Sequence, residues 1–148
     1  MKTISVEFIK TSPTAILPKK GSADAVGYDL YADGPGFLCA HESELVETGL
    51  NIALPSGFEA QVRSRSGLAL KKRVVVLNSP GTIDPDYRGA LGIILMNHGE
   101  ETFHWSHGDR LAQLVIAPVQ PACAMVEVKE FSVPSTERGM YGYGSTGD

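Results

Sequence analysis

Apolar residues at every second position are the feature that most constrains the fold of this chain. The alternation runs through residues 4–8 (Ile-Ser-Val-Glu-Phe), 50–54 (Leu-Asn-Ile-Ala-Leu) and 58–62 (Phe-Glu-Ala-Gln-Val). Successive side chains of a strand point to opposite faces, so a segment with this period buries one face on a core. Each of the three segments is therefore predicted to be a strand with one buried face.

Two other runs are apolar without alternation, at residues 74–77 (Val-Val-Val-Leu) and 91–95 (Leu-Gly-Ile-Ile-Leu). Continuous apolar runs of this length are typical of strands that are covered on both faces. Residues 111–119 form a further predicted strand with prolines at its end, and residues 126–128 (Val-Glu-Val) form another.

Turn residues separate these strands at short intervals, for example at 55–57 (Pro-Ser-Gly), 79–81 (Ser-Pro-Gly) and 107–109 (His-Gly-Asp). Many short strands joined by Gly and Pro turns predict an all-β sandwich or barrel. Residues 66–72 are the one segment predicted as a helix, with Ser66 as its N-cap and two lysines in its last turn.

Composition limits the classes of protein that the chain can belong to. Its 148 residues and 43% hydrophobic content fit one globular domain. No apolar run approaches the length that crosses a membrane, so we expect no membrane partner. Cys39 and Cys123 are far apart and match no metal-ligand spacing, which predicts free thiols in a reducing compartment such as the cytoplasm.

Charge argues against one partner and for another. A net charge of −4 argues against binding to a nucleic-acid polymer. Five of the 13 basic residues nevertheless fall within residues 63–73, which is enough positive charge for a small polyanion. We therefore expect a small anionic ligand rather than DNA or RNA.

The last segment, residues 138–148, interleaves glycines with an arginine, hydroxyl groups and aromatic rings. Backbone N–H groups that are free of Cβ atoms can close on a phosphate. Nothing follows this segment to build the helix that a nucleotide-binding glycine loop requires. It is predicted to be an arm that folds over a ligand held elsewhere, and the alternative is a disordered terminus.

Residues 78–89, between the two apolar runs, carry two carboxylates and a tyrosine among turn residues. Asp84 and Asp86 in such a turn can bond to the backbone and serve only its conformation. A functional hairpin explains the same residues equally well, and the segment alone does not separate the two interpretations.

Five segments in order resemble the motifs of the homotrimeric dUTP pyrophosphatases (dUTPases): residues 26–30, 65–69, 78–89, 108–114 and the glycine-rich tail. The resemblance extends over residues 26–147 and implies a jelly-roll-like distorted barrel or sandwich. It implies a domain over 1–137 and an arm, 138–148, that closes over an active site, in the family that of a neighbouring subunit. It also implies a Mg²⁺-dependent homotrimer that hydrolyses dUTP to dUMP and pyrophosphate.

The resemblance implies a role for each matching residue. Asp84 would deprotonate the water that attacks the α-phosphorus, Gln113 would assist it, and Asp29 would reach Mg²⁺ only through water. Tyr87 would pack under the deoxyribose, and Tyr143 would stack on the uracil. The implied substrate-binding residues are Arg65, Ser66, Gly67, Asn78, Gly81, Thr82, Ile83, Asp84, Tyr87 and Gln113 in the domain and Arg138, Tyr143, Gly144, Ser145 and Thr146 in the arm.

Residue chemistry supports these roles, and a few positions depart from the family pattern. Backbone N–H groups at the start of a helix favour anions, and arginine forks match phosphate oxygens. Tyr143 stands where the family mostly has Phe, and Val26, Ser64 and Thr82 also differ from the usual residues. None of these changes removes a group that the reaction needs.

Two other functions were weighed against this one. A dCTP deaminase of the same fold needs an acid near the pyrimidine, and residues 90–96 carry none. A non-catalytic nucleotide-binding regulator has no use for a base such as Asp84. We interpret His104 and His107 as unrelated to a metal site.

Other residues have structural interpretations. Phe103 and Trp105 are predicted to be core or interface residues, and Asp109 is predicted to pair with Arg110 around a turn. Arg88 is interpreted in the same way, as a partner of Asp86.

Overall fold

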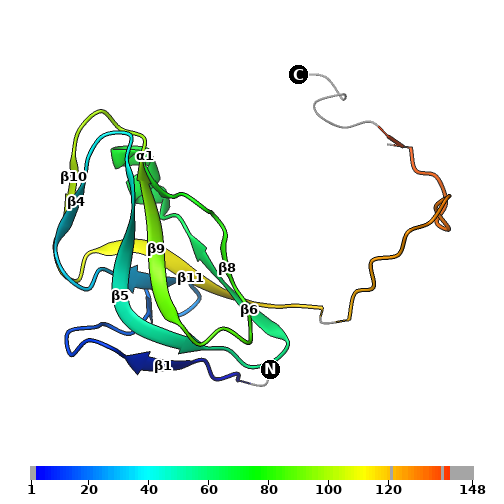
Figure 1. The fold of residues 1–148 in the computed structure, drawn as a ribbon, viewed down its shortest axis with the longest axis horizontal. Coiled ribbons are helices and arrows are strands. Elements are labelled where there is room, and N and C mark those ends of the chain that lie inside the picture. The colour runs from blue at the N-terminus through cyan, green and yellow to red at the C-terminus, as the bar shows by residue number, and fades with distance from the viewer. Residues whose placement is uncertain (1–2, 121, 138, 141–148) are drawn as a thin grey trace.

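The computed structural model describes residues 3–120, 122–137 and 139–140 and shows an all-β domain with one short helix in this part of the chain (Figure 1). The strands are β1 (Glu7–Lys10), β2 (Lys19–Lys20), β3 (Tyr28–Tyr31), β4 (Gly36–Leu38), β5 (Ser43–Ala53), β6 (Phe58–Arg63), β7 (Val74–Val76), β8 (Gly81–Ile83), β9 (Ala90–Asn97), β10 (Phe103–Trp105) and β11 (Arg110–Pro118), and the helix is α1 (Ser66–Lys72). No helix in these ranges is long and apolar enough to cross a membrane.

Two main sheets form a sandwich, and a small sheet closes one side. The first has the order β1-β5-β9-β7, and the second has the order β2-β3-β11-β6-β8. Strands β10 and β4 pair separately. Every pairing is antiparallel, and most neighbours in a sheet are distant in sequence. This arrangement agrees with the predicted jelly-roll-like sandwich.

The core lies between the two main sheets and follows the predicted alternation. Residues 46, 48, 50, 52 and 54 of the β5 region are buried in turn, while the residues between them are not. Ala60 and Val62 of β6 are buried in the same way. The largest fully buried apolar side chains are Leu30, Leu50, Ile52, Leu91, Ile93, Leu95, Leu114 and Val74. Trp105 is buried and Phe103 packs on this core, as predicted.

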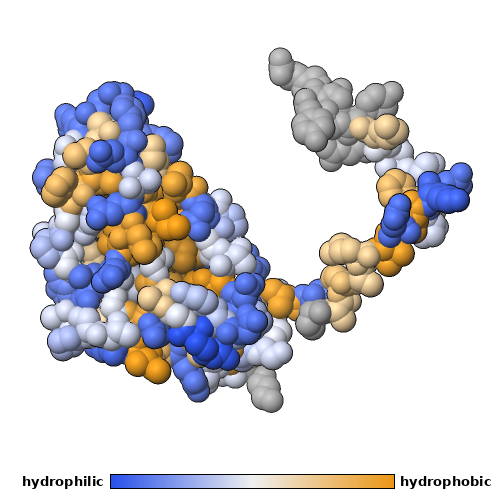
Figure 2. Space-filling model, viewed as in Figure 1, coloured by the Kyte–Doolittle hydropathy of each residue, from blue (hydrophilic) through white to orange (hydrophobic). Residues whose placement is uncertain are grey.

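The prediction that the two apolar runs are covered on both faces was wrong for this chain. In β9, Leu91, Ile93 and Leu95 are buried, but Ile94 is 37% exposed. Leu77, which follows β7, is 52% exposed. The sheet is covered by the core on one face only, so these outward side chains form an apolar surface. Figure 2 shows apolar side chains gathered over the middle of the face that β5 and β9 form.

Two further local predictions need correction. Ser66 is the first residue of α1 rather than its N-cap: Arg65 occupies the N-cap position with extended backbone and makes no side-chain capping bond. Residues 126–128 form no strand, and Val126 and Val128 are exposed. A strand needs a partner to satisfy its backbone groups, and this segment has none within the described chain.

The chain leaves the sandwich after β11. The Val119 N–H donates to the Gly57 carbonyl at this point, 2.9 Å away. Beyond it, the described residues of 122–140 extend away from the domain (Figure 1). Their side chains are exposed, including Met125 at 92% and Phe131 at 87%.

Candidate functional site

A cavity of about 430 Å³ lies beside the hairpin of residues 78–89, between the end of β8 and the strands β5 and β9. We call it the hairpin pocket. Six of the predicted substrate-binding residues line it: Asn78, Gly81, Thr82, Ile83, Asp84 and Tyr87. Of the residues that the resemblance assigned to uracil, deoxyribose and the attacking water, the structure brings those of the hairpin together in one pocket.

Close packing at the start of the hairpin fixes its path. β8 pairs with β6, with Gly81 opposite Val62 and Thr82 opposite Gln61. A Cβ atom at Gly81 would lie 3.2 Å from the Asn78 amide nitrogen and 3.3 Å from the Val62 Cβ. Glycine at this position thus lets the Asn78 side chain lie against the strand.

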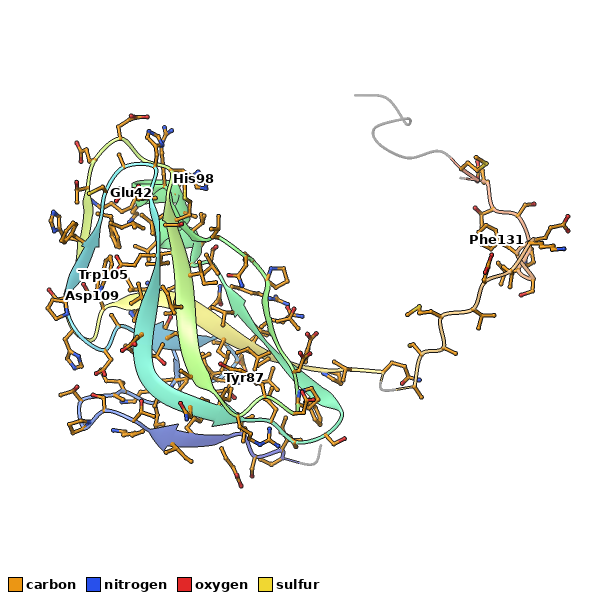
Figure 3. All side chains as sticks on the ribbon, in the orientation of Figure 1. Glu42, Tyr87, His98, Trp105, Asp109 and Phe131 are labelled. Atoms are coloured by element: carbon orange, nitrogen blue, oxygen red, sulfur yellow. The ribbon has the colours of Figure 1, made fainter. Side chains whose placement is uncertain are left out.

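Hydrogen bonds hold the Asp84–Tyr87 turn. The Tyr87 N–H donates to the Asp84 carbonyl at 3.1 Å, and the Tyr87 hydroxyl donates to the Ala90 carbonyl at 2.9 Å. A Cβ atom at Gly89 would lie 2.5 Å from the Tyr87 hydroxyl oxygen, so a larger residue there would require the Tyr87 ring to move. Tyr87 therefore has a fixed orientation where the turn meets β9 (Figure 3).

Arg88 reinforces the same turn, in a way that the sequence did not predict. Its Nη1 donates to the carbonyls of Pro85 and Tyr87, each at 2.7 Å. The predicted partner was Asp86, and the structure corrects this: the bonds go to backbone carbonyls. The turn that carries Asp84 and Tyr87 is thus closed by a side chain within it.

Strands β5 and β9 form the opposite wall of the hairpin pocket, which sequence reasoning missed. Leu45 and Ile94 are Cα partners across the two strands and line the pocket together with Thr11, Glu47 and Gly92. Their side chains follow an ordinary strand pattern, so no local sequence feature distinguishes them. The wall offers an apolar surface opposite the polar hairpin.

Asp29, Arg65 and Arg110 form a second group, which we call the arginine cluster. The Arg65 Nε lies 3.1 Å from one Asp29 carboxylate oxygen, and the Arg110 Nη1 lies 3.2 Å from the other. The Arg65 Nη1 donates to the Arg110 carbonyl at 2.9 Å. The predicted pair of Asp109 and Arg110 was wrong, because the Asp109 carboxylate accepts the Ser106 N–H instead.

The other predicted phosphate-binding residues lie on neighbouring segments. Ser66 and Gly67 are the first two residues of α1, directly after Arg65. The Gln113 amide donates to the Ser64 carbonyl at 2.9 Å. A Cβ atom at Gly27 would clash with the Gln113 amide oxygen, so glycine there leaves space for this side chain.

The second sheet separates the hairpin pocket from the arginine cluster. Gln113 pairs with Asp29 on β3 and with Arg63 on β6, so these three side chains lie on one face. The neighbouring Val62 points to the other face, where it is buried and lines the pocket. Among the described residues, no member of the arginine cluster lines the pocket.

His107 belongs to a third polar group, away from both. Its Nδ1 lies 3.8 Å from an Asp33 carboxylate oxygen, which also accepts the Thr14 hydroxyl at 2.7 Å. Hydrogen bonds from the side chains of Ser12 and then Thr14 hold the pKa of Asp33 below its usual value. No group of three or more His, Cys, Asp or Glu residues is placed to hold a metal ion in the described part of the chain.

The remaining predicted site residues, Arg138, Tyr143, Gly144, Ser145 and Thr146, lie outside the described residues.

The fold and these two groups define a class of protein: a β-sandwich with a mostly apolar pocket at a hairpin and an arginine cluster across one sheet. Such a protein suits a ligand with a planar part and an anionic part. The family model described as dUTPase matches residues 14–147, which is nearly the whole chain. The chain belongs to the dUTPase family.

Relatives of known name match over nearly their whole length. Deoxyuridine 5'-triphosphate nucleotidohydrolase of Syntrophotalea carbinolica is 49% identical over 99% of both chains. The protein of the same name from Crocosphaera subtropica is 46% identical over 97% of this chain and 99% of its own.

Solved structures agree with the fold. A dUTPase mutant of Staphylococcus bacteriophage 80alpha with dUpNHpp has a TM-score of 0.90 at 26% identity and covers 99% of this chain and 100% of its own. A dUTPase mutant of S. aureus phage phi11, described with a structural Mg(II) ion, has a TM-score of 0.80 at 25% identity, over 87% of this chain and 99% of its own.

Proposed function

We propose that this protein hydrolyses dUTP to dUMP and pyrophosphate and so removes a precursor of uracil in DNA. The observation that carries the proposal is the hairpin pocket, because its lining combines a base-reading amide, a fixed tyrosine ring and a carboxylate. Relatives at 46–49% identity bear the name of this activity. The proposal therefore rests on the pocket of this chain and on the family to which it belongs.

Uracil and deoxyribose are selected by the hairpin. The Asn78 amide and the backbone of Thr82 and Ile83 offer donors and acceptors to the edge of a pyrimidine. The Tyr87 ring, held by its bond to the Ala90 carbonyl, packs under the sugar and leaves no room for a 2′-hydroxyl. A pocket of about 430 Å³ has the size of a small-ligand site.

Asp84 is the general base for the attacking water. It lies on the pocket wall, and the turn bond from the Tyr87 N–H to its carbonyl fixes the backbone that carries it. The carboxylate takes a proton from water as the oxygen attacks the α-phosphorus, and pyrophosphate leaves. Gln113 holds the phosphates and the water with its amide.

The triphosphate binds to the group around Arg65. The guanidinium is a planar fork with donors for phosphate oxygens, and Ser66 and Gly67 add backbone N–H groups. In the arm, Arg138, Ser145 and Thr146 clamp the γ-phosphate, Tyr143 stacks on the uracil, and Gly144 also contacts the substrate. Closure of the arm excludes water other than the nucleophile.

Mg²⁺ is the metal that fits this chemistry. Mg²⁺ prefers substrate phosphates and retained waters, with one or two carboxylates, to a cage made by protein alone. The Asp29 carboxylate lies 3.1 Å from the Arg65 Nε, beside the proposed phosphate-binding residues, and would hold the metal through water. When bound, the metal supplies positive charge that neutralises the triphosphate.

The functional unit is a homotrimer whose sites are shared between chains. A β-sheet lies between the hairpin pocket and the arginine cluster of one chain, so one nucleotide reaches both groups only if two chains contribute. Exposed apolar residues after β11, such as Met125, Val126 and Phe131, are suited to contact a second copy. We assign residues 1–137 to the domain and 138–148 to an arm that a neighbour donates.

The protein fits a reducing compartment such as the cytoplasm. Cys39 and Cys123 are both free in the structure.

The function is tested by product analysis. Purified protein is incubated with Mg²⁺ and dUTP, dCTP, dTTP or UTP in separate reactions, and the products are separated by chromatography. We expect dUMP and pyrophosphate from dUTP alone. Release of dUTP from dCTP would instead identify a deaminase, and tight binding of dUTP without any product would identify a regulator.

A further inference from the structure

The arginine cluster is a closed ring of interactions between three segments that are distant in sequence. Asp29 lies on β3, Arg65 precedes α1 and Arg110 begins β11. Each oxygen of the Asp29 carboxylate contacts a different guanidinium, at 3.1 and 3.2 Å. The bond from Arg65 to the Arg110 carbonyl, 2.9 Å long, closes the ring.

The ring leaves binding capacity on its outer side. A guanidinium has five N–H donors. Arg65 donates one of them to the Arg110 carbonyl, and Arg110 donates one to Asp29. The Arg65 Nε contacts the other Asp29 oxygen as an ion pair. The Arg110 side chain is 52% exposed, whereas that of Asp29 is 16% exposed. Arg110 therefore presents free donors to solvent from a position that the carboxylate fixes.

The charge of the cluster favours an anion. Two guanidiniums and one carboxylate carry a net charge of +1. Without Arg110 the charges of Asp29 and Arg65 would cancel, and this ion pair would offer a triphosphate no net positive charge. Arg110 thus makes the cluster positive, and Asp29 limits the repulsion between the two guanidiniums.

We propose that Arg110 is a further phosphate-binding residue, and that Asp29 is a positioning residue that holds Arg65 and Arg110 as a pair. The inference rests on the proposed function, because it names residues of the same phosphate site. It gives Asp29 a task that needs no metal, in addition to its link to Mg²⁺ through water.

The substitution Asp29→Asn separates three roles of this carboxylate. It raises the net charge of the cluster by one, so a purely electrostatic role predicts tighter binding of the triphosphate. A role through Mg²⁺ alone predicts that more Mg²⁺ is needed for half-maximal activity. The positioning role predicts weaker binding of inorganic tripolyphosphate in the absence of Mg²⁺, which a role through Mg²⁺ alone leaves unchanged.

Arg110→Gln is the main variant, and Lys10→Gln is its matched control. Lys10 is an exposed basic residue at the end of β1, in the other main sheet. Calorimetry measures tripolyphosphate binding, and steady-state kinetics measures kcat and KM for dUTP. We expect Arg110→Gln to weaken binding and lower kcat/KM by about tenfold or more, Arg110→Lys to recover part of the loss, and Lys10→Gln to stay within about twofold of wild type.

The double variant Asp29→Asn, Arg110→Gln tests the link between the two residues. If Asp29 acts by positioning Arg110, the double variant loses clearly less than the product of the two single losses. Arg110→Gln at wild-type affinity and kcat/KM, or independent effects in the double variant, would overturn the inference. If Arg110→Gln fails to fold, Arg110→Lys with Asp29→Asn gives the same comparison.

The failure of this inference can be told apart from failure of the proposed function. A wild-type protein that does not hydrolyse dUTP contradicts the function, while tripolyphosphate binding still reports on the cluster. A wild-type protein that hydrolyses dUTP, with an Arg110→Gln variant equal to it in both measurements, contradicts only the inference.

Discussion

The hairpin pocket and the arginine cluster differ in chemistry and lie on opposite faces of one sheet. The pocket is lined mainly by apolar side chains and backbone, with the carboxylates of Asp84 and Glu47, whereas the cluster consists of charged side chains. One suits a base and a sugar, and the other suits phosphates. A single chain carries both groups, but it does not bring them together.

Strand register produces this separation. Val62 and Arg63 are adjacent on β6, yet they point to opposite faces of the sheet because side chains alternate along a strand. Val62 lines the pocket, and Arg63 lies beside Gln113 on the face that carries Asp29. Two faces of one small sheet can thus serve one ligand only if copies of the chain associate.

The largest effect on turnover is expected from Asp84→Asn. This substitution removes the proposed base from the hairpin pocket and leaves the arginine cluster intact. The amide keeps the shape of the side chain but cannot accept the proton of water. We expect kcat to fall at least about a thousandfold, with binding of a non-hydrolysable dUTP analogue within about tenfold of wild type. Steady-state pyrophosphate release and calorimetry measure the two quantities. Retention of more than a few per cent of wild-type kcat would remove Asp84 from the role of base.

Deletion of residues 138–148 removes the arm, which is proposed to cover both the base and the phosphates of the nucleotide. It leaves the core untouched, because the described core residues lie between Ala15 and Leu114. We expect kcat to fall about a hundredfold, since closure excludes water and positions the phosphates, while the thermal midpoint stays unchanged. The measurement compares melting temperature and pyrophosphate release in both proteins. Wild-type turnover of the truncated protein would make the tail a terminus without function.

Tyr87→Ala changes the hairpin pocket and leaves the arginine cluster unaltered. It therefore tests whether the pocket alone selects the sugar. Loss of the ring opens space for a 2′-hydroxyl group. We expect the ratio of kcat/KM for dUTP to that for UTP to fall about tenfold or more, because one steric wall supplies the discrimination. An unchanged ratio would show that another residue selects the sugar.

The smallest effect concerns Asp33, which lies outside both groups. Its pKa is lowered in the folded protein, so its bonds stabilise the fold above the usual carboxyl range, and this contribution is lost as pH falls through the lowered pKa. Thr14→Val removes the 2.7 Å bond to its carboxylate. We expect a slightly lower thermal midpoint than wild type at pH 7, with the difference disappearing in acid. A difference that stays constant from pH 7 to the acid limit would contradict this account.

Much of the fold followed from the sequence, because local periodicity determines which face of a strand is buried. The strands at 50–54 and 58–62 and the helix at 66–72 match the structure closely. The apolar runs were misjudged because composition does not reveal whether a second face is covered by the same chain. Ile94 and Leu77 are apolar and yet exposed in the single chain.

The candidate site was predictable where its residues are neighbours in sequence. Six hairpin residues between Asn78 and Tyr87 line one pocket, as their shared segment suggested. Two other parts of the site depend on contacts between distant segments. They are the opposite wall of the pocket, with Leu45 and Ile94, and the ion pair of Asp29 with Arg110. No local sequence pattern in these segments predicts such long-range contacts.

The central claim, that two chains share each site, is tested most directly by mixing two inactive variants. Asp84→Asn removes the proposed base from the hairpin pocket, and Arg65→Ala removes a proposed phosphate-binding side chain from the arginine cluster. In a mixed trimer, some sites combine an intact pocket from one chain with an intact Arg65 from another. The two proteins are unfolded and refolded together at equal concentration, and each alone serves as the control. Light scattering checks that the mixture has a mass near three times 15.8 kDa.

The account predicts that the mixture recovers up to about a quarter of wild-type pyrophosphate release, the share of sites with both groups intact under random assembly. Each variant refolded alone should stay inactive. A properly assembled mixture with no more activity than its two components would place the whole site within one chain and contradict the account.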